Sequence, residues 1–83
     1  MSAEKASSIE ARMFTVYVQL LDEGTIAYRP VPASKEIEGV CILGGQDIYD
    51  EEVETWEFPP GSRVSYEPRK LDGDIVFVAT GIV

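Results

Sequence analysis

Apolar and polar residues alternate along several short stretches of this chain, and the alternation predicts strands. Between residues 14 and 20 every second residue is apolar, and Thr, Tyr and Gln occupy the positions between them. A period of two places successive side chains on opposite faces of a half-buried strand. An Asp-Glu-Gly sequence then predicts a hairpin turn in which Gly24 adopts a positive φ. Residues 25–29 are predicted to return as a second strand, with Ile26 and Tyr28 on one face.

Two prolines limit this second strand. Pro30 and Pro32 have no backbone N–H to donate to a ladder, so the strand is expected to end, bend or lie at an edge there. Residues 33–35 are predicted to form a loop. A third strand is predicted from residue 36 to residue 43, and Gly44-Gly45 is expected to end it.

The segment from residue 46 to residue 55 fits two interpretations. Tyr49, Val53 and Trp56 follow the i, i+4, i+7 spacing of a short amphipathic helix. The residues from 54 to 58 could instead form a short strand. We favour an acidic loop that leads into such a strand.

Turn-forming residues recur in the last third of the chain. In Pro59-Pro60-Gly61-Ser62, Pro60 fixes φ at the first corner of a type II turn, and Gly61 accepts the positive φ at the second. A strand is predicted to follow over residues 63–68. The Leu-Asp-Gly-Asp sequence at residues 71–74 predicts a second hairpin turn.

The last predicted strand covers residues 75–80. It is an almost continuous apolar and β-branched run, which is typical of a central strand that is covered on both faces. Gly81 is expected to mark a bulge or a kink where the chain closes on itself.

Together these elements predict an all-β fold of five to six short antiparallel strands. Such a meander is most economically arranged as a small closed or half-open barrel, because closure removes exposed edges. The first twelve residues are small, polar and weakly patterned, so 1–12 is expected to be a flexible leader and 13–83 a single domain.

The composition narrows the possible functions. Histidine is absent, which removes the commonest general base and the commonest transition-metal ligand. The single Cys41 cannot form an internal disulfide, and in an apolar strand it is expected to be buried and unreactive. No apolar run approaches the length of a membrane span, and no secretory signal is visible. We therefore expect a soluble, cytoplasmic protein that is not an enzyme and needs no cofactor.

The charge of the chain lies in one segment. Residues 36–57 hold eight acidic residues and no Lys or Arg, whereas the rest of the chain holds seven acids and seven bases. The whole net charge of -8 therefore comes from that segment. A field of one sign repels nucleic acid and anionic membranes, and it attracts basic partners or cations.

The acidic run from Asp47 to Glu57 allows three interpretations. A calcium loop is one, but the spacing does not match the register of an EF-hand. A face that binds a basic partner or mimics a polyanion is the second, and a solvated loop that promotes solubility is the third. Trp56 and Phe58 lie on the same strand face, where they could anchor a partner or close a small core.

Three segments give the chain a family resemblance. Gln19-Leu-Leu-Asp-Glu-Gly-Thr25, Arg29-Pro-Val and Trp56-Glu-Phe-Pro-Pro-Gly-Ser-Arg-Val64 together resemble a group of small uncharacterised bacterial proteins over residues 14–80. The strand order and the Pro-Gly turn before the last hairpin resemble SH3-like barrels in architecture. Neither resemblance implies a catalytic motif or a ligand.

We therefore predict a non-enzymatic protein-binding or accessory module with an acidic face. A nucleic-acid mimic that inhibits a nucleic-acid-binding protein is the alternative. The partner is expected to be a basic protein, with no nucleic acid, membrane or metal bound. A homodimer could form through an edge near residues 29–33 or through the apolar C-terminal end at residues 81–83. The predicted partner-binding residues are Tyr49, Asp50, Glu51, Glu52, Glu54 and Trp56.

Overall fold

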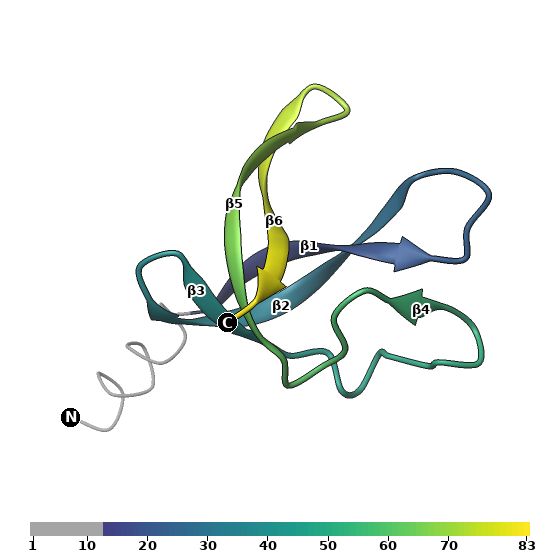
Figure 1. The fold of residues 1–83 in the computed structure, drawn as a ribbon, viewed down its shortest axis with the longest axis horizontal. Coiled ribbons are helices and arrows are strands. Elements are labelled where there is room, and N and C mark those ends of the chain that lie inside the picture. The colour runs from purple at the N-terminus through teal and green to yellow at the C-terminus, as the bar shows by residue number, and fades with distance from the viewer. Residues whose placement is uncertain (1–12) are drawn as a thin grey trace.

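The computed structural model describes residues 13–83, and these residues fold into six strands (Figure 1). The strands are β1 (Met13–Leu21), β2 (Ala27–Ile37), β3 (Val40–Leu43), β4 (Thr55–Trp56), β5 (Arg63–Leu71) and β6 (Asp74–Ile82). The predicted all-β fold is confirmed. The predicted leader, residues 1–12, lies outside the described residues. Within residues 13–83 no helix has the length and hydrophobicity needed to cross a membrane.

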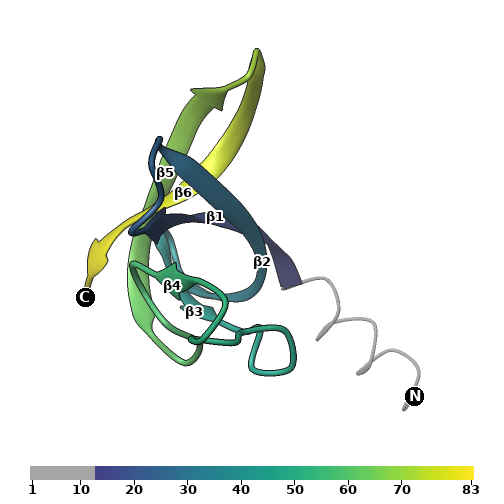
Figure 2. The same ribbon diagram turned by 90° about the vertical axis from the view of Figure 1, so that its right-hand side faces the viewer.

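Five of the strands form a ring, which is visible from the side in Figure 2. The sheet order is β2-β3-β5-β6-β1-β4, and a further pairing of β2 with β1 closes it. Neighbours in this meander are antiparallel, except that β1 and β6 meet in parallel where Tyr17 pairs with Val78. An odd number of alternating strands brings the first and the last together in the same direction, so the closing pair must be parallel.

The core lies inside this ring. On β1 the predicted alternation holds, because Val16 and Val18 are fully buried while Thr15 is exposed. The buried cluster comprises Val16, Val18, Val31, Ala33, Cys41, Leu43, Trp56, Phe58, Val64 and Ala79. Phe14, Leu20, Tyr49 and Tyr66 pack against it.

The second strand is longer than the sequence predicted. β2 runs through both prolines and includes residues 33–35, so the predicted loop is wrong. The carbonyl oxygen of Pro32 accepts a hydrogen bond from the Gly44 N–H at 2.7 Å, which turns the backbone of Pro32 away from β1. Pro30 is two residues away and therefore faces the same side. Neither ring nitrogen interrupts the ladder between β1 and β2.

One predicted turn and the predicted start of the third strand need correction. The turn after β1 places Asp22 at φ +61°, whereas Gly24 does not adopt a positive φ. Aspartate tolerates this left-handed conformation better than most residues do. The third strand starts only at Val40, because the chain turns back at Gly39 with φ +79°.

The other predicted turns are confirmed. Gly61 has φ +89°, and the Ser62 N–H donates to the Pro59 carbonyl oxygen at 3.2 Å, as in a type II turn. Asp72 and Gly73 both have positive φ, which is the signature of a type I′ hairpin loop. The register of β5 and β6 shifts so that Thr80 is an extra residue on β6, which places the expected bulge directly before Gly81.

The predicted burial of the last strand is wrong. Ile75 is 69% exposed and Phe77 is 43% exposed; only Val78 and Ala79 are buried. The β5–β6 hairpin extends beyond the ring (Figure 1), and Ile75 and Phe77 lie on the part that is left largely uncovered by the described residues 13–83. A continuous apolar run was therefore a poor guide to burial at this position.

The buried thiol of Cys41 gives a direct test of the core. Burial raises the pKa of the Cys41 thiol to about 11, and the side chain is inaccessible in the native fold. A thiol reagent at mildly alkaline pH is therefore expected to react roughly a thousandfold more slowly than with denatured protein, because reaction requires opening of the fold. Equal rates in the absence and presence of denaturant would contradict this core assignment.

Candidate functional site

The acidic loop, residues 44–54, joins β3 to β4 through two consecutive tight turns. The Ile48 and Tyr49 N–H groups donate to the Gly45 carbonyl oxygen at 3.0 and 2.9 Å. The Val53 and Glu54 N–H groups donate to the Asp50 carbonyl oxygen at 2.9 and 3.0 Å. These bonds confirm the prediction of a loop that leads into a short strand, because neither turn continues into a helix.

The side chain of Asp50 also shapes this loop. Its Oδ1 atom accepts a hydrogen bond from the Glu52 N–H at 3.0 Å. An aspartate that binds the backbone two residues ahead mimics a backbone turn. Asp50 therefore has a local structural role in addition to its charge.

The start of the loop lies directly on the ring of Trp56. Gly45 has φ +92°, and a Cβ atom at this position would lie 2.9 Å from Cη2 and 3.2 Å from Cζ3 of Trp56. Only glycine combines this backbone conformation with so close an approach. The contact joins the acidic loop to the hydrophobic core.

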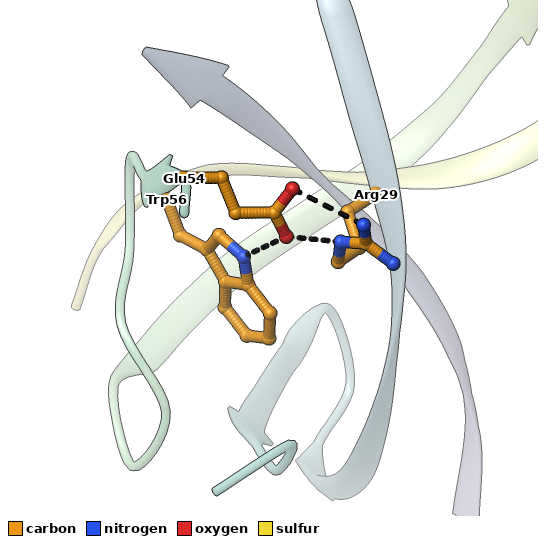
Figure 3. Close-up of polar contacts among 3 residues, drawn as sticks. All are labelled: Arg29, Glu54 and Trp56. Atoms are coloured by element: carbon orange, nitrogen blue, oxygen red, sulfur yellow. Dashed lines mark hydrogen bonds and ion pairs between the residues drawn. The ribbon is translucent and has the colours of Figure 1, made fainter. Parts of the chain in front are cut away.

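A cluster of three side chains joins the end of the loop to β2 (Figure 3). The Glu54 carboxylate accepts hydrogen bonds from Nε and Nη2 of Arg29, the latter at 3.1 Å. Its Oε1 atom also accepts a bond from Nε1 of Trp56 at 2.9 Å. The Glu54 side chain is only 12% exposed, so this carboxylate belongs to the fold and is not offered to solvent.

The same contacts shift the titration of both charged partners. Hydrogen bonding from Arg29, and then from Trp56, lowers the pKa of Glu54 below its ordinary value. The hydrogen bond to Glu54 raises the pKa of Arg29. The pair is therefore fully charged near neutral pH, and the indole N–H keeps a charged acceptor.

The ring of Tyr49 covers Trp56 from the loop side. The two ring centroids are 4.7 Å apart, and the ring planes are tilted by 55°. Tyr49 is half-buried, whereas Trp56 is almost fully buried. Of the two interpretations of Trp56 and Phe58, closure of the core is the one that the structure supports.

The six predicted partner-binding residues thus fall into two groups. Trp56 and Glu54 point inward and hold the loop to the ring. Asp50, Glu51 and Glu52 are exposed on the outer turn, and Tyr49 lies between the two groups. Whether these residues bind a partner stays a prediction, but Trp56 does not present an exposed ring for that purpose.

The acidic segment separates into paired and solvated carboxylates. Glu36 contacts Arg63, Glu38 contacts Lys35 at 3.3 Å, and Glu54 contacts Arg29. Within residues 13–83, the remaining five acids of the segment form no ion pair. These five residues are Asp47, Asp50, Glu51, Glu52 and Glu57, and all of them are exposed.

Three residues of this site were not predicted from the sequence. They are the exposed aliphatic residues Ile48 and Val53, and Arg29, which pairs with Glu54. Ile48 is 48% exposed and Val53 is 75% exposed, so the loop that carries the unpaired carboxylates also exposes two aliphatic side chains. Two apolar residues inside an acidic run could have been recognised as a sign of this surface. Arg29 could not, because 25 residues separate it from Glu54 along the chain.

The acids of the loop do not converge on one point. Among residues 13–83, no group of three or more His, Cys, Asp or Glu side chains has an arrangement that could hold a metal ion. The residues from Asp47 to Glu52 line a shallow depression on this loop. The surface therefore combines dispersed negative charge with exposed aliphatic groups.

Comparisons of the chain with protein-family models, with curated proteins and with solved structures find no match.

Proposed function

We propose that this protein is a non-enzymatic protein-binding or accessory module of the bacterial cytoplasm, in which an SH3-like barrel carries the acidic loop as its binding surface. One observation carries the proposal. Four exposed carboxylates, those of Asp47, Asp50, Glu51 and Glu52, have no ion-pair partner within residues 13–83 and belong to the same loop as the exposed aliphatic side chains of Ile48 and Val53.

The partner that fits this surface is a basic segment that also bears an apolar side chain. The carboxylates would steer the basic groups towards the loop and raise the rate of association. Ile48 and Val53 would then bury apolar area against the partner, beside the half-buried ring of Tyr49. In this arrangement the carboxylates determine the association rate and the selectivity for basic partners, and burial of the aliphatic side chains contributes much of the binding free energy.

The attachment of the loop supports the same proposal. Gly45, Trp56 and Glu54 fix both ends of the loop to the ring, so little conformational entropy remains to be lost on binding. A preorganised loop binds more tightly than a flexible one with the same contacts.

Neutralising the outer turn tests the proposal. We expect the triple variant Asp50→Asn, Glu51→Gln, Glu52→Gln to bind a fluorescein-labelled peptide of alternating Lys and Leu about tenfold or more weakly at low ionic strength. Asparagine at position 50 retains an oxygen for the Glu52 N–H, so the turn itself is preserved. Fluorescence anisotropy gives the dissociation constants.

A matched control changes the same number of charges elsewhere. Asp22→Asn, Glu23→Gln and Glu38→Gln alter exposed acids in the β1–β2 and β2–β3 turns and are expected to weaken peptide binding by less than about twofold. Equal losses in the two triple variants would mean that only net charge matters, and the proposed surface would be wrong.

The double variant Ile48→Ser, Val53→Ser separates this proposal from the nucleic-acid mimic. A module that anchors its partner by apolar contacts should lose affinity in this variant, roughly tenfold for two buried aliphatic side chains. A mimic of a phosphate surface should bind polybasic peptides as before, with affinity falling steeply as salt is added. Unchanged affinity in this variant would favour the mimic.

A further inference from the structure

The arm, residues 67–78 of the β5–β6 hairpin, extends beyond the neighbouring strands, and the outer edge of β6 is one of its two exposed strand edges (Figures 1 and 2). On its inner side β6 pairs with β5 along its whole length. On its outer side, within residues 13–83, it first meets another strand where Val78 pairs with Tyr17. The edge from Asp74 to Phe77 therefore faces no strand in the described fold.

The hairpin register determines which backbone groups face this edge. Leu71 and Asp74 flank a two-residue loop, and such a pair directs its backbone groups towards each other. The direction alternates along an antiparallel ladder, so the N–H and C=O of Ile75 and the N–H of Phe77 point outward. Phe77 pairs with Pro68, so the ring of that proline lies on the opposite outer edge and removes no bond from the ladder.

The two outer edges of the arm differ sharply in chemistry. The β5 edge carries Glu67-Pro68-Arg69-Lys70, all exposed, and charged residues and proline are the usual means of preventing edge-to-edge pairing. The β6 edge carries Ile75-Val76-Phe77, which contains no charge and no proline. One edge of the same hairpin is thus protected, and the other is open to an added strand.

A groove of about 430 Å³ lies beside the arm. Val76 and Leu71 line it from the arm, and Tyr17, Ile26 and Tyr28 line it from the β1–β2 hairpin. Side chains on one face of an added strand would enter this groove. Side chains on its other face would lie towards Ile75 and Phe77, whose ring packs against Phe14 and Tyr66 at centroid distances of 5.7 and 5.2 Å.

We propose that the outer edge of β6 binds an extended segment of a partner protein by strand addition, with apolar residues at the centre of the segment and a basic residue at the end beside Asp72 and Asp74. Strand addition draws affinity from backbone hydrogen bonds and specificity from alternate side-chain pockets. The charged residues that line the groove are Lys70, Asp72 and Asp74, which leave its tip negative overall. A second copy of this chain is a poorer occupant, because each copy carries a net charge of -8.

Amide hydrogen exchange followed by NMR tests the edge directly. The probe is a synthetic decapeptide of alternating Val and Thr residues with Lys at both ends, added to the full chain. We expect the exchange of the Ile75 and Phe77 amides to slow at least tenfold when the peptide is bound, whereas the Lys70 amide on the protected edge changes little. Protection of the Ile75 amide in the free protein, or no added protection with peptide, would overturn the proposal.

Two substitutions at one exposed position sharpen the test. Ile75→Pro removes an outward N–H at a position equivalent to that of Pro68, and it should weaken peptide binding at least tenfold. If that variant does not fold, Ile75→Lys retains the N–H and adds the kind of charge that protects the β5 edge, and it should give a similar loss. Unchanged binding in the folded variant would contradict strand addition.

Two further measurements separate the remaining outcomes. The acidic-loop variant Asp50→Asn, Glu51→Gln, Glu52→Gln should bind the decapeptide as the wild type does, so failure of one site leaves the other untouched. Light scattering over a range of concentrations should find a monomer. A dimer that disappears in Ile75→Pro would assign the edge to a second copy and overturn the partner claim.

Discussion

Replacement of Gly45 with alanine is expected to destabilise the fold by about 3 kcal/mol. This is the largest loss of stability that we expect from adding a single methyl group to this structure. Two effects add. A left-handed backbone costs an L-residue about 1–2 kcal/mol, and the new Cβ would lie 2.9 Å from the ring of Trp56. Since that ring is buried and hydrogen-bonded, it cannot move aside cheaply. Urea unfolding followed by the fluorescence of the single tryptophan measures the loss.

Two other glycines separate these effects. Gly61 has a similar φ of +89° but open space at the Cβ position, so Gly61→Ala should cost only the backbone part, about 1–2 kcal/mol. Gly24 has neither a positive φ nor a neighbour within 4 Å, so Gly24→Ala should change stability by about 0.5 kcal/mol or less. If Gly45→Ala cost no more than Gly61→Ala, the packing of the loop on Trp56 would be refuted.

Removal of the Glu54 carboxylate is expected to have the second largest effect. Glu54→Ala should cost about 2 kcal/mol, because it leaves the buried indole N–H of Trp56 without an acceptor and also deletes the ion pair with Arg29. The indole accounts for most of this loss, since the Arg29 side chain is partly exposed to solvent and its pairing is screened. Glu54→Gln retains an oxygen for the indole and should cost about 1 kcal/mol.

The pH dependence of these variants provides an independent check. The pKa of Glu54 is lower in the folded protein than its ordinary value of 4.5. The ionised Glu54 therefore makes its full contribution to the free energy of unfolding above pH 4.5. The contribution disappears as the pH falls through the lowered pKa of the folded state. The stability difference between wild type and Glu54→Gln should therefore shrink on acidification. A difference that stays constant down to the lowest measurable pH would contradict the pairing.

Glu57 is the control for this position. It is an exposed acid three residues further along the chain and forms no ion pair within residues 13–83. Glu57→Gln should change stability by less than about 0.5 kcal/mol, with no comparable change on acidification. Equal effects at positions 54 and 57 would show that net charge, and not the Glu54 contacts, determines stability.

Local sequence signals identified most of the strands because strand alternation and turn chemistry act over a few residues. The alternation around Val16 and Val18 found β1, and Gly61 and Asp72-Gly73 located their turns. The prolines of β2 led to a wrong prediction because a proline weakens a sheet only where its missing N–H would face a neighbouring strand. That property belongs to the assembled sheet and not to the segment.

Burial and long-range pairing were harder to predict for the same reason. The run Ile75-Val76-Phe77 has the composition of a covered strand, but coverage depends on where the ring ends. The acidic run was recognised, but its division into anchored and solvated carboxylates depends on Arg29, which lies on another strand. Composition therefore revealed the charge, and only the fold revealed which acids remain available.

The indole N–H of Trp56 offers the most direct test of the anchored acidic loop on which the proposed function depends. This chain has one tryptophan, so its indole gives a single proton resonance whose exchange with solvent can be followed by NMR. We predict slow exchange in the wild type, unchanged in the variant of Asp50, Glu51 and Glu52, and accelerated at least tenfold in Glu54→Ala. Rapid exchange of the wild-type indole would show that Trp56 does not donate a hydrogen bond to Glu54, and the anchored loop would be refuted.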